Sequence, residues 1–214
     1  MKIQYHFQIT TEALGEHFSP YALQVILAAN QKQDNLRGQI GHPEFHFDDN
    51  GIAEGLAYMG AQRDIILKVL QESPEEKRSL IPAWEAFGRL THSAQDFYAH
   101  SNYAALWLAG YPERDLPGPS EIEPLNLEVL AHPNLCTGKF TTLELLSYVL
   151  PFLKPLAQRR LPQDTHLHMH LDNPERGDLF LYACAAARKR TLAEYEGLVA
   201  ELSLSQRSQF CGRK

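Results

Sequence analysis

Three side chains that can bind a metal ion recur at intervals of four residues in one part of the chain. They are His92, Asp96 and His100, within the run THSAQDFYAH. Residues four apart in an α-helix differ by only about 40° around its axis, so these three would form one stripe on a single helical face. Imidazole and carboxylate groups together suit zinc and similar divalent ions. The spacing therefore predicts a metal site along this helix.

Further candidate ligands lie far from this stripe in the sequence. They are imidazoles and carboxylates near the start of the chain, in a polar segment after residue 33, and near residue 170: His6, Asp34, His46, Asp48, His168 and Asp172. The last two repeat the four-residue spacing. If the run HLHMH were an extended strand, His166, His168 and His170 would all point to one face, as ligands or as a surface histidine patch. Taken singly, each candidate is also typical of a surface histidine or of an aspartate that caps a turn.

Composition excludes several classes of function. The net charge of -6 does not favour a nucleic-acid surface. The cysteines, Cys136, Cys184 and Cys211, are far apart and odd in number, which predicts neither a disulfide framework nor a zinc knuckle. No secretory signal and no stretch of transmembrane length is evident, so we expect a cytoplasmic protein, or one exported without a cleavable N-terminal signal.

Helices are predicted wherever apolar residues recur at helical spacing. Ser19 would cap the first of them, and His6 would lie just before it. The third would begin at the cap signal of Ser73, would carry the metal stripe, and would be kinked or split at Pro82. The predicted helices span residues 19–33, 51–72, 73–108 and 175–203, with another that begins at Thr141 and bends at Pro151.

The rest of the chain is expected to be irregular. Prolines and glycines crowd residues 110–140, which predicts a long irregular excursion. The run at 166–170 is the one place where a strand is an alternative. A length of 214 residues with 44% hydrophobic residues suits a single core. We therefore expect one all-α domain over residues 1–214.

The order of these motifs resembles the HET-C proteins of fungal heterokaryon incompatibility and their bacterial relatives. Those proteins are similar in turn to the superfamily of zinc-dependent phospholipases C and single-strand nucleases. The resemblance runs in one order over residues 5–103 and more loosely to the end. Its motifs are His6-xx-Ile9-xxx-Ala13-Leu14, Asn30-xxx-Asp34, Phe45-His46-Phe47-Asp48 and Leu90-Thr91-His92-xx-Gln95-Asp96-Phe97-Tyr98-Ala99-His100-Ser101-Asn102-Tyr103.

This resemblance implies a helical bundle of the zinc-dependent phospholipase C and nuclease type, holding two or three zinc ions and no other cofactor. Asp34 would also act as general base, with Asp48 as the second choice, and His166 or His170 would be rivals of His168. The implied ligands are His6, Asp34, His46, His92, Asp96, His100, His168 and Asp172.

Two features depart from the pattern of those enzymes. The secreted enzymes bind metal through the amino group and carbonyl of an N-terminal tryptophan, whereas this chain begins with Met1 and has no tryptophan near its start. His100 also follows Asp96 by four residues, where the enzymes have a longer gap and a helix break. Metal binding is therefore a firmer expectation than turnover.

The implied activity is hydrolysis of a phosphodiester, in a phospholipid or a nucleotide, by metal-activated water. A membrane surface would then be a further partner, and aromatic residues near the stripe would contact lipid or base, although such residues more often pack in the core. These aromatic residues are Phe97, Tyr98, Tyr103 and Trp107.

Two other interpretations stay open. The chain could be a non-catalytic, metal-stabilised module of the HET-C type that acts as a toxin, in cell death or in protein interaction. A fully closed ligand set would favour this, because structural zinc leaves no open position. Alternatively, it could be a helical bundle that contains no metal, and then His92→Ala would change its stability little.

Overall fold

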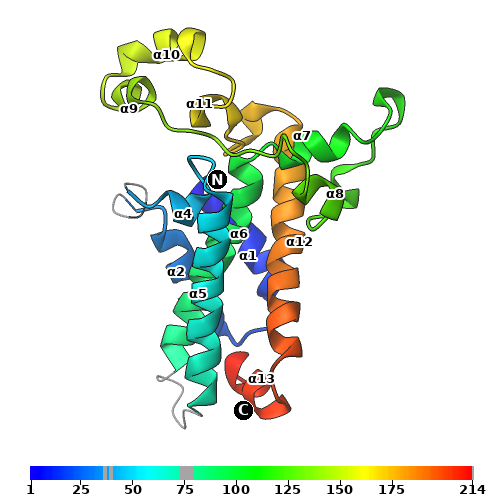
Figure 1. Ribbon diagram of the computed structural model, residues 1–214. Helices are drawn as coiled ribbons and strands as arrows, with labels where there is room; N and C mark the ends of the chain where they lie inside the picture. Colours follow the sequence, from blue (N-terminus) through cyan, green and yellow to red (C-terminus); the bar gives the residue numbers. More distant parts are fainter. Residues whose placement is uncertain (36–37, 39–40, 73–79, 214) are drawn as a thin grey trace.

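A bundle of long helices forms the body of the molecule. The computed structural model describes residues 1–35, 38, 41–72 and 80–213, and this part of the chain is mostly helical without strands, which confirms the expected all-α class. The central helix is α6, which packs against the other four long helices (Figure 1). These elements are α1 (Ile3–Leu14), α2 (Pro20–Lys32), α5 (Ile52–Gln71), α6 (Ile81–His100) and α12 (Leu179–Ala200).

The sequence of α6 explains its central place. Every residue from Leu90 to His100 is buried, and Trp84 and Phe87 are fully buried one or two turns earlier. Burial of each such large apolar side chain contributes roughly 1.5–3 kcal/mol. A helix that is buried all round must be enclosed by others, so α6 is the element from which ligands can meet partners from several helices.

The boundaries of this helix differ from the expectation. Pro82 lies in the first turn, where its missing N–H costs nothing, so it begins the helix and does not kink it. The expected start at Ser73 lies outside the described residues. The expected continuation to Leu108 is also wrong, because the backbone is extended at Ser101 and a separate helix, α7 (Tyr103–Leu108), follows.

The N-terminal part holds a helix that the sequence analysis did not expect. His6 lies within α1, not in front of the first helix. That helix is half exposed, and its buried apolar positions, Ile9, Ala13 and Leu14, are spaced as a helix requires, so the signal was present in the sequence. The expected helix at 19–33 is α2, and Ser19 caps it by accepting a hydrogen bond from the backbone of Ala22. The helix expected at 51–72 is α5.

Residues 101–178 form short elements at one end of the bundle (Figure 1). The stretch 110–140 is mainly irregular, as expected, and Thr141 caps a helix, α9 (Thr142–Val149). This helix was expected to bend at Pro151, but it ends at Val149, and a separate helical turn begins at Pro151. Two other short helices lie elsewhere in the chain: α4 (Pro43–His46) precedes α5, and α13 (Leu204–Phe210) follows α12. The remaining short elements are η2 (Glu113–Asp115), η3 (Pro119–Glu121), α8 (Leu127–Leu130), η4 (Pro151–Leu153), α10 (Lys154–Arg160), α11 (His166–Met169) and η5 (Pro174–Arg176).

Two expectations for this half are corrected. The run at 166–170 is not a strand: residues 166–169 form the short helix α11, in which His166 and His170 stack with ring centroids 5.1 Å apart. Five alternating residues are too few to distinguish an extended segment from one helical turn. The helix expected at 175–203 ends at Ala200 and is followed by α13, which is capped by Ser203.

The two ends of the bundle differ in what they carry. The N-terminus lies near α4 at the end covered by α7 to α11, and the C-terminus lies with α13 at the other end (Figure 1). At that other end Phe210 packs against Phe18 and Phe87, and the indole of Trp84 donates to the Phe210 carbonyl. Within the described residues, every helix is too short or too polar to cross a membrane.

Candidate metal centre

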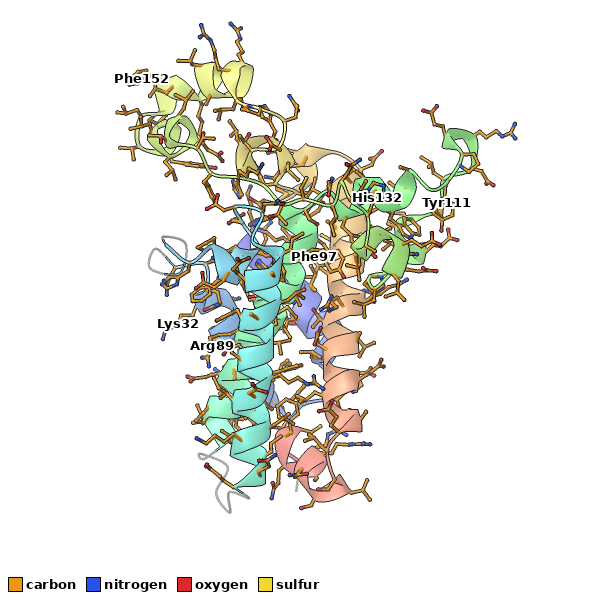
Figure 2. All side chains as sticks on the ribbon, in the orientation of Figure 1. Lys32, Arg89, Phe97, Tyr111, His132 and Phe152 are labelled. Atoms are coloured by element: carbon orange, nitrogen blue, oxygen red, sulfur yellow. The ribbon has the colours of Figure 1, made fainter. Side chains whose placement is uncertain are left out.

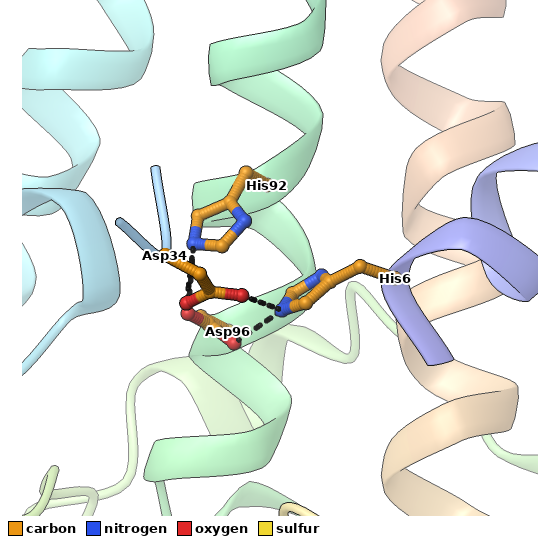
Figure 3. A group of neighbouring side chains, drawn as sticks. All are labelled: His6, Asp34, His92 and Asp96. Carbon is orange, nitrogen blue, oxygen red and sulfur yellow. Dashed lines mark ion pairs between the residues drawn. The ribbon is translucent and has the colours of Figure 1, made fainter. Parts of the chain in front are cut away.

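Four of the predicted ligands meet at the face of α6. One ligand atom from each of them lies within 4.8 Å of those of the other three, and Figure 3 shows their side chains pointing toward one another. Helix α6 contributes two of these residues, α1 contributes one, and the fourth follows α2. They are His6, Asp34, His92 and Asp96.

The distances between these atoms suit a tetrahedral ion. His92 Nε2 lies 3.1 Å from a carboxylate oxygen of Asp96 and 3.8 Å from one of Asp34, and His6 Nε2 lies 3.2 and 3.8 Å from oxygens of the same two residues. Ligand atoms about 2.0–2.1 Å from a tetrahedral zinc ion lie about 3.4 Å from one another. The four groups could therefore surround one ion with small movements.

His46 joins this group from the C-terminal end of α4. Its Nδ1 lies 2.8 Å from Asp96 Oδ2 and 3.2 Å from His92 Nε2. The residue that follows, Phe47, adopts a left-handed backbone with φ of 57°, and packs its ring edge-on against Phe97. This turn points His46 back toward α6, and so brings a fifth predicted ligand to the cluster.

A second group lies one turn further along α6. Asp48, His100 and His166 each offer a ligand atom within 4.8 Å of the others. Asp48 Oδ1 lies 3.0 Å from His100 Nδ1, and Asp172 Oδ1 lies 3.4 Å from His100 Nε2. Asp172 also pairs with His170 at 3.0 Å. The structure thus brings Asp48, His100 and Asp172 beside the first group.

His168 is the predicted ligand that the structure does not bring to either group. Within the described part of the chain its ring makes none of the contacts that join the cluster, and its buried Nε2 has no hydrogen-bond partner. His166, named as its rival, occupies that place. The difference follows from the helical turn of α11, because residues two apart point to opposite sides of a helix.

Glu144 is a candidate ligand that sequence reasoning missed. It is fully buried on α9, its Oε1 lies 3.1 Å from His166 Nδ1, and its Oε2 has no hydrogen-bond partner. Thr141 accepts a hydrogen bond from the Glu144 backbone, so the T-x-x-E pattern has an adequate explanation as a helix start. An acidic residue among Leu143, Leu145 and Leu146 was the available signal.

Gln95 orients one of the ligands from behind. Its Oε1 lies 2.6 Å from His6 Nδ1, and its amide nitrogen donates to the hydroxyls of Thr10 and Thr191. An amide oxygen can only accept a hydrogen bond, so the proton of His6 lies on Nδ1, which leaves Nε2 free to bind a cation. The buried polar network therefore fixes both the orientation and the tautomer of this imidazole.

The amino group of Met1 adds a positive charge to the cluster. It donates to Asp96 Oδ1 at 2.6 Å and lies 3.0 Å from Asp172 Oδ1. Burial alone would lower the pKa of this group, but the carboxylates of Asp172, Asp96 and Asp34 raise it to about 11. The carboxylates are thus arranged to attract a cation.

The protonation states suit metal binding at the first group. Burial opposes ionisation of Asp96, yet the Met1 ammonium and the nearby histidines hold its pKa well below the usual range. Burial, followed by the neighbouring His6, lowers the pKa of His92 well below its usual value. A buried carboxylate and a neutral imidazole are the forms that bind a divalent ion.

The pKa values of His100 and Asp34 are raised, whereas those of Asp96 and His92 are lowered. Burial would lower the pKa of His100, but Asp48 and Asp96 raise it well above the usual value. Burial, and then the charge of Asp96, raises the pKa of Asp34. Asp34 is therefore a better proton acceptor near neutral pH than an ordinary aspartate.

Solvent reaches the cluster at its edge. His6, His92 and Asp96 are completely buried, whereas the side chains of Asp34 and Asp172 are 10% and 22% exposed. A hollow of about 610 Å³ is lined in part by Gln33 and Phe45, the residues that precede Asp34 and His46. The cations Lys32 and Arg89 also line this hollow (Figure 2).

The aromatic residues near the stripe belong to the core. Phe97, Tyr98, Tyr103 and Trp107 are all at least 96% buried. The hydroxyl of Tyr103 donates to the carbonyl of Glu123, and that of Tyr98 to the carbonyl of Pro124. Both contacts fix the excursion at 110–140 against α6. These rings therefore pack inside the protein and do not face a ligand.

A comparison with protein families gave one informative result. The model of the VWA7 N-terminal domain matches residues 5–119. Searches of curated proteins and of solved structures gave no match. The matched residues begin within α1 and end in η3, so they contain the first group of candidate ligands entirely, with His46, Asp48 and His100. Glu144, His166 and Asp172 lie beyond them.

Proposed function

The chain belongs to the VWA7 N-terminal domain family, and on the basis of its buried histidine and aspartate cluster we propose that it is a zinc-dependent phosphodiester hydrolase. The observation that carries the proposal is the convergence of His6, Asp34, His92 and Asp96 within 4.8 Å. The resemblance of the sequence to HET-C proteins, and through them to zinc-dependent phospholipases C and nucleases, supports the same conclusion.

The residues present fit such an ion. Buried His6 Nε2 and Asp34 Oδ2, which lie 3.8 Å apart, have no hydrogen-bond partner among the described residues, although His6 Nε2 also lies 3.2 Å from Asp96 Oδ1. A buried polar atom left without a partner costs about 1–3 kcal/mol, and several at one place are hard to explain without a ligand. Nitrogen and carboxylate oxygen are the donors that zinc prefers.

Two sites follow from the two groups. The first ion would be held by His6, Asp34, His92 and Asp96, with His46 beside them. The second ion would be held by Asp48, His100 and His166. Asp172 and Glu144 stand next to this second group and would complete it.

The chemistry divides between the ions and the protein. Two zinc ions would supply the positive charge that neutralises the phosphoryl oxygens and makes a water molecule acidic. Asp34 lies at the solvent edge of the first group, so it would be the residue that accepts the proton of the attacking water. Lys32 and Arg89 in the neighbouring hollow would attract the negatively charged phosphodiester of a phospholipid or nucleotide.

A second candidate function rests on the burial of the first group. His6, His92 and Asp96 are completely buried, and four protein ligands would close a tetrahedral site. Such a site would stabilise the fold without turnover, in a module of the HET-C type that acts as a toxin or through protein interaction.

Metal analysis combined with hydrolysis assays separates these functions. The purified protein should contain zinc, and His92→Ala and Asp96→Asn should lose it, whereas the matched variant His132→Ala, at an exposed histidine, should keep it. Chelator-sensitive cleavage of bis-p-nitrophenyl phosphate, p-nitrophenyl phosphorylcholine or single-stranded DNA would support the hydrolase. Bound zinc with no cleavage would favour the structural module, and equal zinc in all variants would refute both.

A further inference from the structure

Helix α9 exposes its apolar residues and buries its polar ones. Glu144 and Ser147 are fully buried, whereas Leu145 is 54% and Val149 is 76% exposed. An ordinary surface helix has the reverse pattern, with its apolar stripe toward the core. The burial of Glu144 against His166 fixes this orientation, so the outward apolar face is a consequence of how α9 packs.

The exposed apolar surface continues beyond α9 through η4 and α10. Phe152 is 74% exposed, and Figure 2 shows it at the outer limit of the molecule, directed away from the bundle. We name this surface the apolar crown. It consists of Leu145, Leu146, Tyr148, Val149, Leu150, Phe152 and Leu156, each at least 39% exposed.

Seven large apolar side chains exposed within residues 145–156 are unusual on a protein surface. Single exposed apolar side chains are common, but a contiguous patch marks a surface that binds a partner or a membrane. The same elements carry three exposed cations, Lys154, Arg159 and Arg160. The acidic residue of α9 and α10, Glu144, is buried on the opposite face.

The charge of the crown points to the nature of its partner. The whole chain carries a net charge of -6, yet this surface is positive. Two positive crowns would repel each other, which disfavours a second copy of the chain as the occupant. Apolar and aromatic side chains beside lysine and arginine are typical of elements that lie in the surface of a membrane with anionic lipids.

We propose that the apolar crown binds the surface of an anionic phospholipid bilayer. Val149 and Phe152 enter the boundary of the acyl chains, and Lys154, Arg159 and Arg160 contact the phosphate and carboxylate groups of the lipids. Glu144 on the inner face of α9 connects this surface to the second group of candidate ligands. The binding itself needs no turnover, and only the choice of a phospholipid as substrate rests on the proposed function.

Vesicle sedimentation tests this binding. The protein as purified should sediment with vesicles of phosphatidylcholine and phosphatidylserine, and far less with phosphatidylcholine alone. Val149→Ser combined with Phe152→Ser should lower the partition coefficient on the order of 100-fold, because two large apolar side chains no longer leave water. Arg159→Gln combined with Arg160→Gln should lower it about 25-fold on the anionic vesicles.

All these substitutions are at exposed side chains, so differences in vesicle binding can be compared without a change in folding. The control is Leu204→Ser at a leucine that is 82% exposed on α13, which should bind as the wild type does. Circular dichroism melts should agree for all variants, since no altered side chain is buried. Equal sedimentation of the wild type and the Val149→Ser, Phe152→Ser variant would overturn the proposal. So would a dimer, measured by light scattering without lipid, that this variant abolishes.

Hydrolysis of a soluble substrate separates this proposal from the proposed function. The Val149→Ser, Phe152→Ser variant should cleave bis-p-nitrophenyl phosphate at the wild-type rate. If the wild type binds anionic vesicles through the crown but cleaves nothing, the docking surface stands and the hydrolase does not. If the wild type shows chelator-sensitive cleavage but does not bind vesicles, the docking surface is wrong and the hydrolase stands.

Discussion

The imidazole of His6 is held by Gln95, whose Oε1 lies 2.6 Å from Nδ1 of the histidine. This contact joins α1 to the central helix. The same glutamine donates to Thr10 on α1 and to Thr191 on α12, and its Oε1 accepts from Asn30 on α2, so four helices meet at one buried amide. The residue between the metal-binding positions of α6 therefore matters as much to the site as the ligands.

Replacing Gln95 with leucine should weaken metal binding while leaving all ligands in place. His6 would lose the partner that fixes its tautomer, and loss of such a contact commonly lowers metal affinity about 10–100-fold. Loss of the hydrogen bonds from Gln95 to Thr10 and Thr191 should also lower the free energy of unfolding by roughly 2–4 kcal/mol. Competition with a chromogenic chelator would measure the affinity.

The matched control for Gln95 is Gln8→Leu on the exposed face of α1, where the glutamine contacts only Glu12 among the described residues. It should leave both the affinity and the stability unchanged. Equal zinc affinity in Gln95→Leu and the wild type would show that Gln95 does not orient the ligand.

Substituting Gly88 should disturb the packing that positions Asp34. A Cβ at Gly88 would lie 2.3 Å from the carbonyl oxygen of Ile26 and 2.8 Å from the Cβ of Ala29, both on α2. Gly88→Ala would force α2 away from α6 and should destabilise the protein by about 1–3 kcal/mol. Urea unfolding would measure the change.

Gly60 provides the comparison for Gly88. It lies within the helix α5, and a Cβ there meets nothing within 4 Å. Gly60→Ala should raise the free energy of unfolding by roughly 0.5–1 kcal/mol, because alanine favours the helix. An equal change in the free energy of unfolding for the two alanine variants would show that α2 and α6 do not approach each other closely at Gly88.

Removing the Glu144 carboxylate should affect one ion and spare the other. Glu144→Gln would leave His6, Asp34, His92 and Asp96 untouched, so we expect zinc per chain to fall by about one ion. Elemental analysis would measure this. Glu128→Gln, at an exposed position in the first turn of α8, should change nothing. Full zinc content in Glu144→Gln would exclude Glu144 from the second group.

Zinc binding should release a proton from His100. Burial would lower the pKa of His100, but the charges of Asp48 and Asp96 raise it well above the usual value. The metal-free protein therefore carries this proton at pH 7. A metal ligand must be deprotonated, so zinc should displace about one proton and bind more tightly as the pH rises. Calorimetry in buffers of different ionisation enthalpy would count it. A binding enthalpy that does not depend on the buffer would contradict this.

The same shift sets a pH dependence for the stability of the metal-free protein. Charged His100 stabilises the fold, and because its folded pKa is raised, this contribution is complete below the unfolded pKa of about 6.5. It is lost as the pH rises through the folded pKa. In the His100→Gln variant, the free energy of unfolding should not fall at alkaline pH as it does in the wild type. Urea unfolding with chelator at several pH values would show it.

The sequence by itself determined the stripe on α6. His92, Asp96 and His100 share a face because helical periodicity is a local property, and the long apolar run around them requires a buried helix. The all-α class and the irregular stretch at 110–140 follow from similarly local signals of apolar spacing, proline and glycine. The split expected at Pro82 fits the start of α6, because proline suits the first turn of a helix, whereas no local signal stated that Ser101 ends it.

Only the tertiary structure decided which distant residues meet that stripe. His6, Asp34 and His46 lie 46 or more residues before His92, and their approach depends on how α1, α2 and α4 pack on α6. His166 takes the place expected for His168 because α11 is a helical turn, and Glu144 faces inward because its carboxylate meets His166. Such choices depend on contacts between elements, which spacing along one chain does not encode.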